Sequence, residues 1–219
     1  EHAHQIWNHI EYKEPFEINE FVSVTCHNTG HILGSCAYVF LNKKTGKRIT
    51  FTGDLGNSPN PLLQDADIKF ETDYMVIESV YGDRNHESRN ERRKFLEEAI
   101  EDNYKRKGTL IIPTFSLERS QELLFELNYL VEGNRIPVMP IFLDSPLAIR
   151  LTEVFKQYKE YFNESAQKAM SADKHLFDFP GLHSTLKTEE SKMIANVSNP
   201  KVVIAGSGMS AGGRIVHHE

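Results

Sequence analysis

Short segments in which apolar and polar residues alternate dominate the first part of the chain and predict β-strands. The pattern predicts a short helix running into a loop over residues 1–15, followed by strands at 21–25, 36–41, 48–52 and 74–78. Residues 42–47 are turn-type residues that include Gly46, and they predict a β-hairpin between the two strands they join. The last of these strands delivers Glu78 to its carboxyl end, where sites gather in α/β folds.

From Ser88 onward the pattern changes to alternating helices and strands. It predicts helices at 88–108, 117–131, 148–162 and 189–196, and strands at 110–113, 138–143 and 201–205. Repeated βα units predict a parallel sheet with right-handed crossover connections. We therefore expect an α/β chain of two domains, residues 1–95 and 96–219.

Composition narrows the class of protein. Of the 219 residues 39% are hydrophobic, which is enough for a globular core. No apolar run approaches the roughly 20 residues of a membrane helix, so no membrane association is expected. The chain begins at Glu1 with neither an initiator methionine nor a signal-peptide pattern, which leaves room for sequence upstream. Cys26 and Cys36 make no disulfide framework, and we expect buried thiols in a reducing cytoplasm.

The formal charge of −6 argues against nucleic-acid binding through overall electrostatics. Bound divalent ions would change this locally. Basic residues cluster within 89–94 and 105–107, but both clusters lie in a glutamate-rich helical segment and are interpreted as a solvated helix face.

Three residues with metal or acid–base chemistry follow in order along the first part. His31 lies in the small-residue loop Gly-His-Ile-Leu-Gly-Ser, Asp54 follows a predicted strand, and Glu78 ends another. A loop histidine alone is rarely a ligand, and an aspartate after glycine usually serves turn chemistry. Only the combination of these three residues with later motifs favours a metal or catalytic site.

The segments GHILGS, FTGDLG, ESVYGDR, IIPTFSLERSQELL, FLDSPLA and GSGMSAGGR, in this order, resemble the successive signatures of the β-CASP family. Members of that family are metallo-β-lactamase-fold ribonucleases, relatives of the polyadenylation-factor endonuclease and of ribonuclease J. The resemblance implies a partial αββα metallo-β-lactamase lobe in residues 1–95. It also implies a Rossmann-like β-CASP lobe with a mainly parallel sheet in residues 96–219, with RNA entering between the lobes.

The resemblance assigns roles to the three residues. His31 and Asp54 would be metal ligands, with Asp54 bridging two zinc ions, and Glu78 would orient a histidine that protonates the leaving group. Imidazole nitrogen and carboxylate oxygen suit zinc, and paired ions about 3.5–4 Å apart activate water for phosphodiester hydrolysis. Asp54 and Glu78 are thus the predicted catalytic residues.

The resemblance also implies an RNA-binding surface in the second domain. The glycine-rich loop 206–213 would form one wall of it, since such loops present backbone N–H groups to phosphate. Six residues are candidate RNA or phosphate contacts: Thr114, Ser116, Arg119, Ser145, Ser207 and Gly208. The alternative for Thr114 or Ser116 is a helix N-cap.

The sequence departs from the complete family pattern. The motif His-x-His-x-Asp-His is absent, because the nearest segment, His2-Ala3-His4, is followed by Ile6 and Trp7 where aspartate and histidine are required. The family's later histidine motifs would lie beyond Glu219, and His217 and His218 match neither. Two ligands do not make a stable zinc site. We therefore expect an internal fragment that is inactive by itself and binds zinc weakly.

Two other function classes stay open: a β-CASP homologue that has lost catalysis and serves as an RNA-binding or scaffold subunit, and a nucleotide-binding module bearing a glycine-rich loop. A glyoxalase- or lactamase-type hydrolase shares the first motifs but lacks the β-CASP signatures. The complete enzyme would act on RNA and could form a homodimer; endonuclease and 5′ exonuclease activity are not distinguished.

Overall fold

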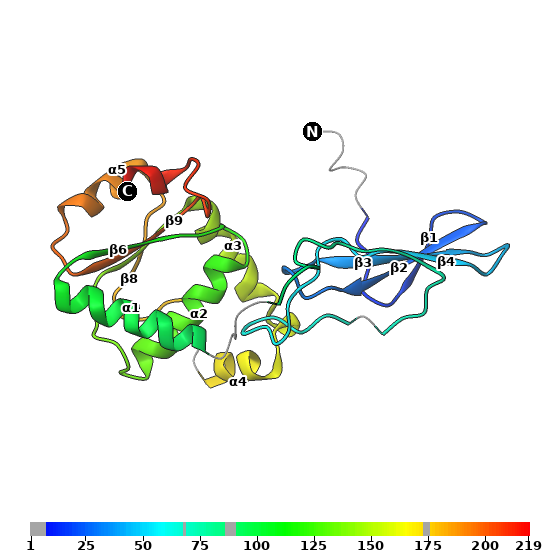
Figure 1. Cartoon of the computed structure of the whole chain (residues 1–219), viewed down its shortest axis with the longest axis horizontal. Coiled ribbons are helices and arrows are strands. Elements are labelled where there is room, and N and C mark those ends of the chain that lie inside the picture. The colour runs from blue at the N-terminus through cyan, green and yellow to red at the C-terminus, as the bar shows by residue number, and fades with distance from the viewer. Residues whose placement is uncertain (1–7, 68, 86–90, 173–175) are drawn as a thin grey trace. The chain divides into compact units, whose positions relative to one another are not determined.

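The computed structural model describes residues 8–67, 69–85, 91–172 and 176–219, in two compact units, Glu1–Asn85 and His86–Glu219 (Figure 1). The division lies before the predicted boundary at residue 95. That position falls inside the helix α1, Arg92–Arg106, which lies against strands of the second unit. Because α1 packs against β6 (Thr109–Pro113) and β9 (Lys201–Ala205), the whole of α1 belongs to the second unit.

The first unit contains a five-stranded sheet with the order β1-β2-β3-β4-β5. Its strands are β1 (Pro15–Glu17), β2 (Val22–Asn28), β3 (Cys36–Asn42), β4 (Arg48–Phe51) and β5 (Tyr74–Val76). Neighbours are antiparallel except β4 and β5, which run parallel. The predicted hairpin is confirmed: β3 and β4 pair, and Gly46 takes a φ of 71° in the turn.

The sequence predicts a short helix running into a loop over residues 1–15, and the structure describes only the later part of this segment. Residues 1–7, with His2 and His4, lie outside the described part, and residues 8–15 contain no helix. Tyr12 instead makes a bridge to Cys26, and Pro15 begins a strand that pairs with β2. Pairing with β2 determines the structure of this segment, and a local sequence pattern does not reveal such a partner.

The strand register sorts the side chains of this sheet onto two faces. Val39 and Thr50 are directly opposite each other and buried. The segment between β4 and β5 lies along this face, because its Phe70 ring contacts the His27 ring at a tilt of 49° with centroids 4.8 Å apart, and its Thr72 hydroxyl accepts a hydrogen bond from that of Thr50 at 2.9 Å. One face is thus covered by the chain's own loop.

The opposite face is apolar and largely uncovered. Five of its side chains are between 40% and 61% exposed: Phe16, Tyr38, Phe51, Tyr74 and Val76. An aromatic and β-branched surface across a whole sheet is typical of a face that receives another layer. We call these five residues the exposed sheet face.

The second unit contains a four-stranded sheet with the order β6-β9-β7-β8, and every neighbouring pair is parallel. The strands are β6 (Thr109–Pro113), β7 (Ile141–Asp144), β8 (Leu182–Ser184) and β9 (Lys201–Ala205). The prediction that the strands near 110, 138 and 201 are neighbours in one sheet is confirmed. All of β9 is buried, as expected for a central strand covered on both faces.

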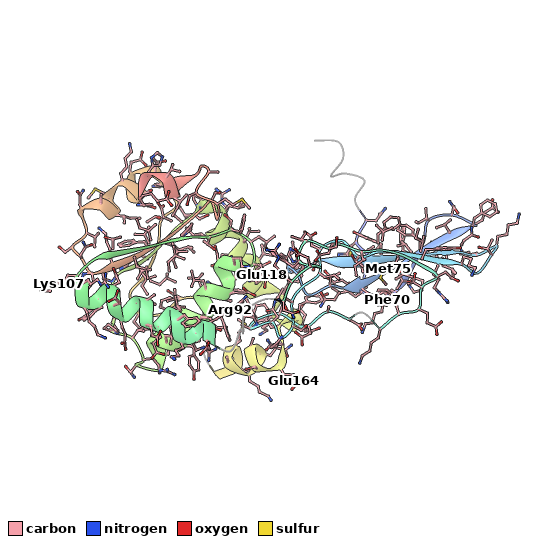
Figure 2. The ribbon with its side chains drawn as sticks, viewed as in Figure 1. Phe70, Met75, Arg92, Lys107, Glu118 and Glu164 are labelled. Carbon is pink, nitrogen blue, oxygen red and sulfur yellow. The ribbon has the colours of Figure 1, made fainter. Side chains whose placement is uncertain are left out.

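Helices cover both faces of this sheet. They are α1 (Arg92–Arg106), α2 (Arg119–Glu132), α3 (Pro146–Gln157), α4 (Glu164–Ala172) and α5 (Thr188–Met193), with short 3₁₀ turns η3 (Lys159–Tyr161), η4 (Ile194–Asn196) and η5 (Arg214–His217). Figure 1 shows α2 and α5 on opposite sides of the sheet, and Figure 2 shows Arg92 and Lys107 at the two ends of α1. The connection from β6 to β7 and that from β8 to β9 run in opposite directions along the sheet. Right-handed crossovers therefore place their helices on opposite faces. The α/β class is confirmed.

No helix in the described ranges has both the length and the apolarity needed to cross a membrane.

Candidate metal centre and nucleic-acid interface

In the first unit, His31 and Asp54 approach each other on adjoining loops. The Nε2 atom of His31 lies 3.7 Å from Oδ2 of Asp54, and both side chains are partly exposed. His31 is on the loop between β2 and β3, and Asp54 follows β4. The structure thus brings together the two residues predicted to be metal ligands.

Glycine makes this approach possible. The Gly56 amide donates to the Thr29 carbonyl at 2.8 Å, and a Cβ on Gly56 would lie 2.0 Å from the carbonyl oxygen of Gly30. Gly30 has a φ of 62°, which glycine adopts without strain. The loop that carries Asp54 can therefore touch the loop that carries His31 only while position 56 has no side chain.

Ser35 orders the histidine loop, a role the sequence interpretation missed. Its Oγ accepts from the backbone amides of His31 and Ile32, both at 3.2 Å, and from the Thr29 hydroxyl at 2.8 Å. A small hydroxyl four positions after a candidate ligand is the signal that could have indicated this.

Glu78 binds backbone amides on both sides of the site. Its Oε1 accepts from the Leu55 amide at 3.2 Å and its Oε2 from the Val80 amide at 3.1 Å. The Glu78 amide donates to the Thr52 hydroxyl at 3.3 Å. Because Leu55 follows Asp54 directly, the Glu78 carboxylate helps hold the loop that presents Asp54.

The donor set fits part of a zinc shell. Two ligand atoms bound at about 2.0–2.1 Å with tetrahedral geometry lie about 3.3 Å apart. The 3.7 Å between His31 and Asp54 is close to this separation. A catalytic zinc ion needs at least three protein ligands. The described residues include no cluster of three or more His, Cys, Asp or Glu side chains arranged to hold a metal ion. This pair would therefore supply part of a shell.

In the second unit, predicted RNA contacts meet at the carboxyl edge of the sheet. The hydroxyls of Ser116 and Ser145 are 3.0 Å apart, and a Cβ on Gly206 would lie 3.6 Å from each. Thr114 is buried and its amide donates to the Ala205 carbonyl at 3.0 Å. The ends of β6, β7 and β9 thus form one cluster of hydroxyls and glycine backbone.

The alternative that Thr114 or Ser116 caps α2 is wrong. The residue before α2 is Glu118, with a φ of 64° and no side-chain cap, and the Arg119 amide donates to the Leu117 carbonyl at 2.8 Å. This i to i+2 bond makes a γ-turn of the strained type, and strain of this kind gathers at functional sites. Figure 2 labels Glu118, whose side chain is buried.

The other predicted RNA contacts lie in different local environments. Ser145 is the N-cap of α3, accepting from the Ala148 amide at 3.3 Å. Arg119 is half exposed and pairs with Glu122 at 2.7 Å. The Ser207 amide closes the glycine-rich loop by donating to the Gly212 carbonyl at 3.3 Å, and Gly208 lies against the Phe115 ring.

A buried carboxylate, Asp144, organises this edge and was not predicted. It is fully buried at the end of β7 and accepts four hydrogen bonds. The donors are Thr185 Oγ1 at 2.6 Å, Ser191 Oγ at 2.5 Å, Arg214 Nη1 at 2.6 Å and His218 Nε2 at 2.7 Å. Burial raises the pKa of Asp144, but the hydrogen bonds from these side chains outweigh it and leave the pKa below its ordinary value.

This network fixes the end of the glycine-rich loop. Arg214 follows Gly213 directly, and the next residue, Ile215, donates its amide to the Gly206 carbonyl at 2.9 Å. A Cβ on Gly213 would lie 2.5 Å from that same carbonyl oxygen. Asp144 therefore anchors one end of the loop whose backbone is a candidate phosphate contact.

Comparison with known proteins shows which proteins this chain is similar to. Residues 120–219 match the model of the Beta-Casp domain. The chain is 38% identical to Ribonuclease TTHA0252 of Thermus thermophilus, over 95% of this chain and 47% of that protein. It is 33% identical to Transcription termination factor FttA of Pyrococcus horikoshii, over 95% of this chain and 32% of that protein. Cleavage and polyadenylation specificity factor subunit 3 of Dictyostelium discoideum is 31% identical, over 80% and 23%. The chain spans less than half the length of these relatives, and its residues 120–219 belong to the Beta-Casp domain family.

Proposed function

We propose that this chain is part of a zinc-dependent ribonuclease that hydrolyses RNA phosphodiester bonds. The observation that carries the proposal is the 3.7 Å approach of His31 and Asp54 on two loops fitted together by glycine. The names of the relatives, a ribonuclease and factors of transcription termination and of cleavage and polyadenylation, support an RNA substrate. A cytoplasmic location fits such a substrate.

Paired zinc ions would supply an activated water and charge stabilisation for the phosphate. His31 and Asp54 would be among the ligands that hold these ions. Both side chains reach solvent, so donors from other parts of a longer polypeptide have room to complete the shell. With only these two ligands among the described residues, this chain by itself would hold zinc weakly and would not cleave RNA.

Glu78 would position other groups without touching a metal ion. Both of its carboxylate oxygens accept backbone amides, one of them from the residue after Asp54. Replacing the carboxylate with an amide removes one acceptor and would loosen that loop. The family role, orienting a histidine that protonates the leaving group, is compatible with this position.

The RNA strand would lie along the carboxyl edge of the parallel sheet. Ligands of open α/β sheets bind outside the carboxyl ends of the strands. The hydroxyls of Ser116, Ser145 and Ser207, the half-exposed Arg119 and the Gly208 backbone would offer donors there, and the buried Thr114 lies beneath them at the end of β6.

The experiment compares Asp54→Ala, Glu78→Gln and a control, Asp102→Asn, in the longest polypeptide that carries this chain. Asp102 is an exposed carboxylate on α1 that pairs with Arg106 at 3.0 Å, so its replacement is expected to change neither zinc content nor cleavage. Bound zinc and single-turnover RNA cleavage are measured together. We expect Asp54→Ala to abolish cleavage and lower the zinc content. Glu78→Gln should retain its zinc and cleave about 10- to 10,000-fold more slowly.

The same measurements separate the alternatives. A wild-type protein that binds RNA but neither holds zinc nor cleaves would be the scaffold homologue, and the ribonuclease proposal would be rejected. Cleavage by Asp54→Ala at the wild-type rate would remove Asp54 from the site.

A further inference from the structure

Large apolar side chains project at the same edge of the second sheet as the hydroxyl cluster. Phe115, Leu147 and Met209 are 52%, 58% and 77% exposed. They follow β6, β7 and β9, which are parallel neighbours, so their carboxyl ends meet at one edge. A surface that combines apolar side chains with hydroxyl donors suits a ligand that has both an apolar face and polar edges.

The backbone of Phe115 is held firmly. Its carbonyl accepts from the Ser120 hydroxyl at 2.7 Å and from the Thr114 hydroxyl at 3.3 Å. The preceding amide, that of Thr114, joins the loop to the end of β9 through the Ala205 carbonyl. An aromatic residue on so constrained a backbone loses little further freedom when a ligand stacks on it.

The ring of Phe115 lies on the glycine-rich loop. A Cβ on Gly208 would be 2.9 Å from both Cδ2 and Cε2 of Phe115, a distance that real side chains do not occupy. The ring therefore packs on bare backbone and still leaves half of the side chain open to solvent. Since packing alone does not bury this ring, it is available as a flat surface for a ligand.

The flanking groups point to a nucleobase rather than to a protein side chain. Ser116, the next residue, and Ser145 place two hydroxyls 3.0 Å apart, and Arg119 begins the helix that follows. Aromatic rings combined with hydroxyl, guanidinium and backbone donors are the usual surface for unpaired bases and their phosphates.

We propose that Phe115 is a stacking platform for one base of single-stranded RNA, with the glycine-rich loop contacting the adjoining phosphate. The proposal rests on the function proposed above and adds to it a residue that contacts the base. Stacking is tolerant of sequence because every base has a π-face. Phe115 thus sets the position of a nucleotide without reading its identity.

The experiment measures binding of a fluorescein-labelled single-stranded RNA by anisotropy, using this 219-residue chain in EDTA so that no metal-dependent cleavage occurs. A matched RNA lacks its bases but keeps its ribose-phosphate backbone. The variants are Phe115→Leu, Phe115→Trp and a control, Phe95→Leu, which alters an equally exposed phenylalanine on α1. Circular dichroism checks that each variant is folded.

We expect Phe115→Leu to bind ordinary RNA about 5- to 100-fold more weakly and the abasic RNA as the wild type does. Phe115→Trp should retain binding, and Phe95→Leu should match the wild type. Equal losses on both RNAs, or no loss, would overturn the stacking role while leaving the cleavage proposal intact, since zinc content and cleavage are measured separately. A wild-type chain that binds neither RNA would overturn the stacking proposal. If the longer polypeptide nevertheless cleaved RNA, its contacts with RNA would lie elsewhere.

Discussion

Removing the Asp144 carboxylate tests whether the network at the carboxyl edge holds the second unit together. Asp144 is fully buried and accepts hydrogen bonds from four side chains, one of them the cation Arg214. Asp144→Ala would leave the largely buried Arg214 guanidinium without its anion. Breaking a buried ion pair in this way costs about 3–5 kcal/mol of stability. A domain has about 5–15 kcal/mol in total, so the loss would be a large share of it.

The assay is urea unfolding at neutral pH, followed by circular dichroism at 222 nm. All five α-helices of the described residues belong to the second unit, so the helical signal reports on that unit. Asp144→Asn is the companion variant, because it keeps the volume and some acceptors while removing the charge. We expect it to lose less than Asp144→Ala. The control Asp102→Ala removes an exposed pair with Arg106 and should change stability by no more than about 1 kcal/mol.

The reasoning is refuted if Asp144→Ala loses less than about 1 kcal/mol, the size of one ordinary hydrogen bond. Such a result would mean that the partners of Asp144 find water or other acceptors at no cost, and that the end of the glycine-rich loop is fixed by backbone contacts alone.

Three further predictions concern the pH dependence of the Asp144 network, the contact at Gly56 and the exposed sheet face. Because the pKa of Asp144 is lowered on folding, its contribution to stability is complete above the unfolded pKa of about 3.9 and is lost as pH falls through the folded value. The stability gap between wild type and Asp144→Asn should therefore close as the pH falls from about 5 to below about 4 in a series of urea titrations. Gly56→Ala should lose about 1–3 kcal/mol in tyrosine-monitored unfolding, because its Cβ would meet the Gly30 carbonyl, whereas Gly212→Ala, with open space around it, should not. The exposed sheet face should make this chain bind the dye ANS, and Phe51→Lys should lower that fluorescence; unchanged dye binding would show that the dye binds elsewhere.

The parts of the fold that local sequence controls were predictable. The β3–β4 hairpin has a turn with Gly46 between two alternating strands, and each βα unit of the second sheet repeats one pattern. Three elements, β1, β8 and α4, were not predicted. The strand Leu182–Ser184 is short and mostly exposed, and it is a strand because it pairs with β7. No periodicity marks such an element.

Local sequence patterns also decide which site residues were predictable. His31, Asp54 and Glu78 lie in short motifs whose order resembles a family, so the sequence alone could nominate them. Asp144 lies in the FLDSPLA motif, but that motif does not indicate its partner His218, which lies 74 positions further along the chain and outside the six motifs. Long-range polar partners leave no local signature, so only coordinates show which carboxylate is central.

Both candidate sites are presented by backbone contacts that glycine permits, and this explains why the motifs are rich in glycine without matching a nucleotide-binding pattern. In the first unit Gly56 lets the Asp54 loop touch the His31 loop, and in the second Gly208 lets an aromatic ring lie on the chain. In each case a methyl group would push apart the two segments that carry the chemistry. The glycines are thus required for the geometry of the sites even if none of them touches a phosphate, and alanine at either position would disturb ligand binding through displacement of its neighbours.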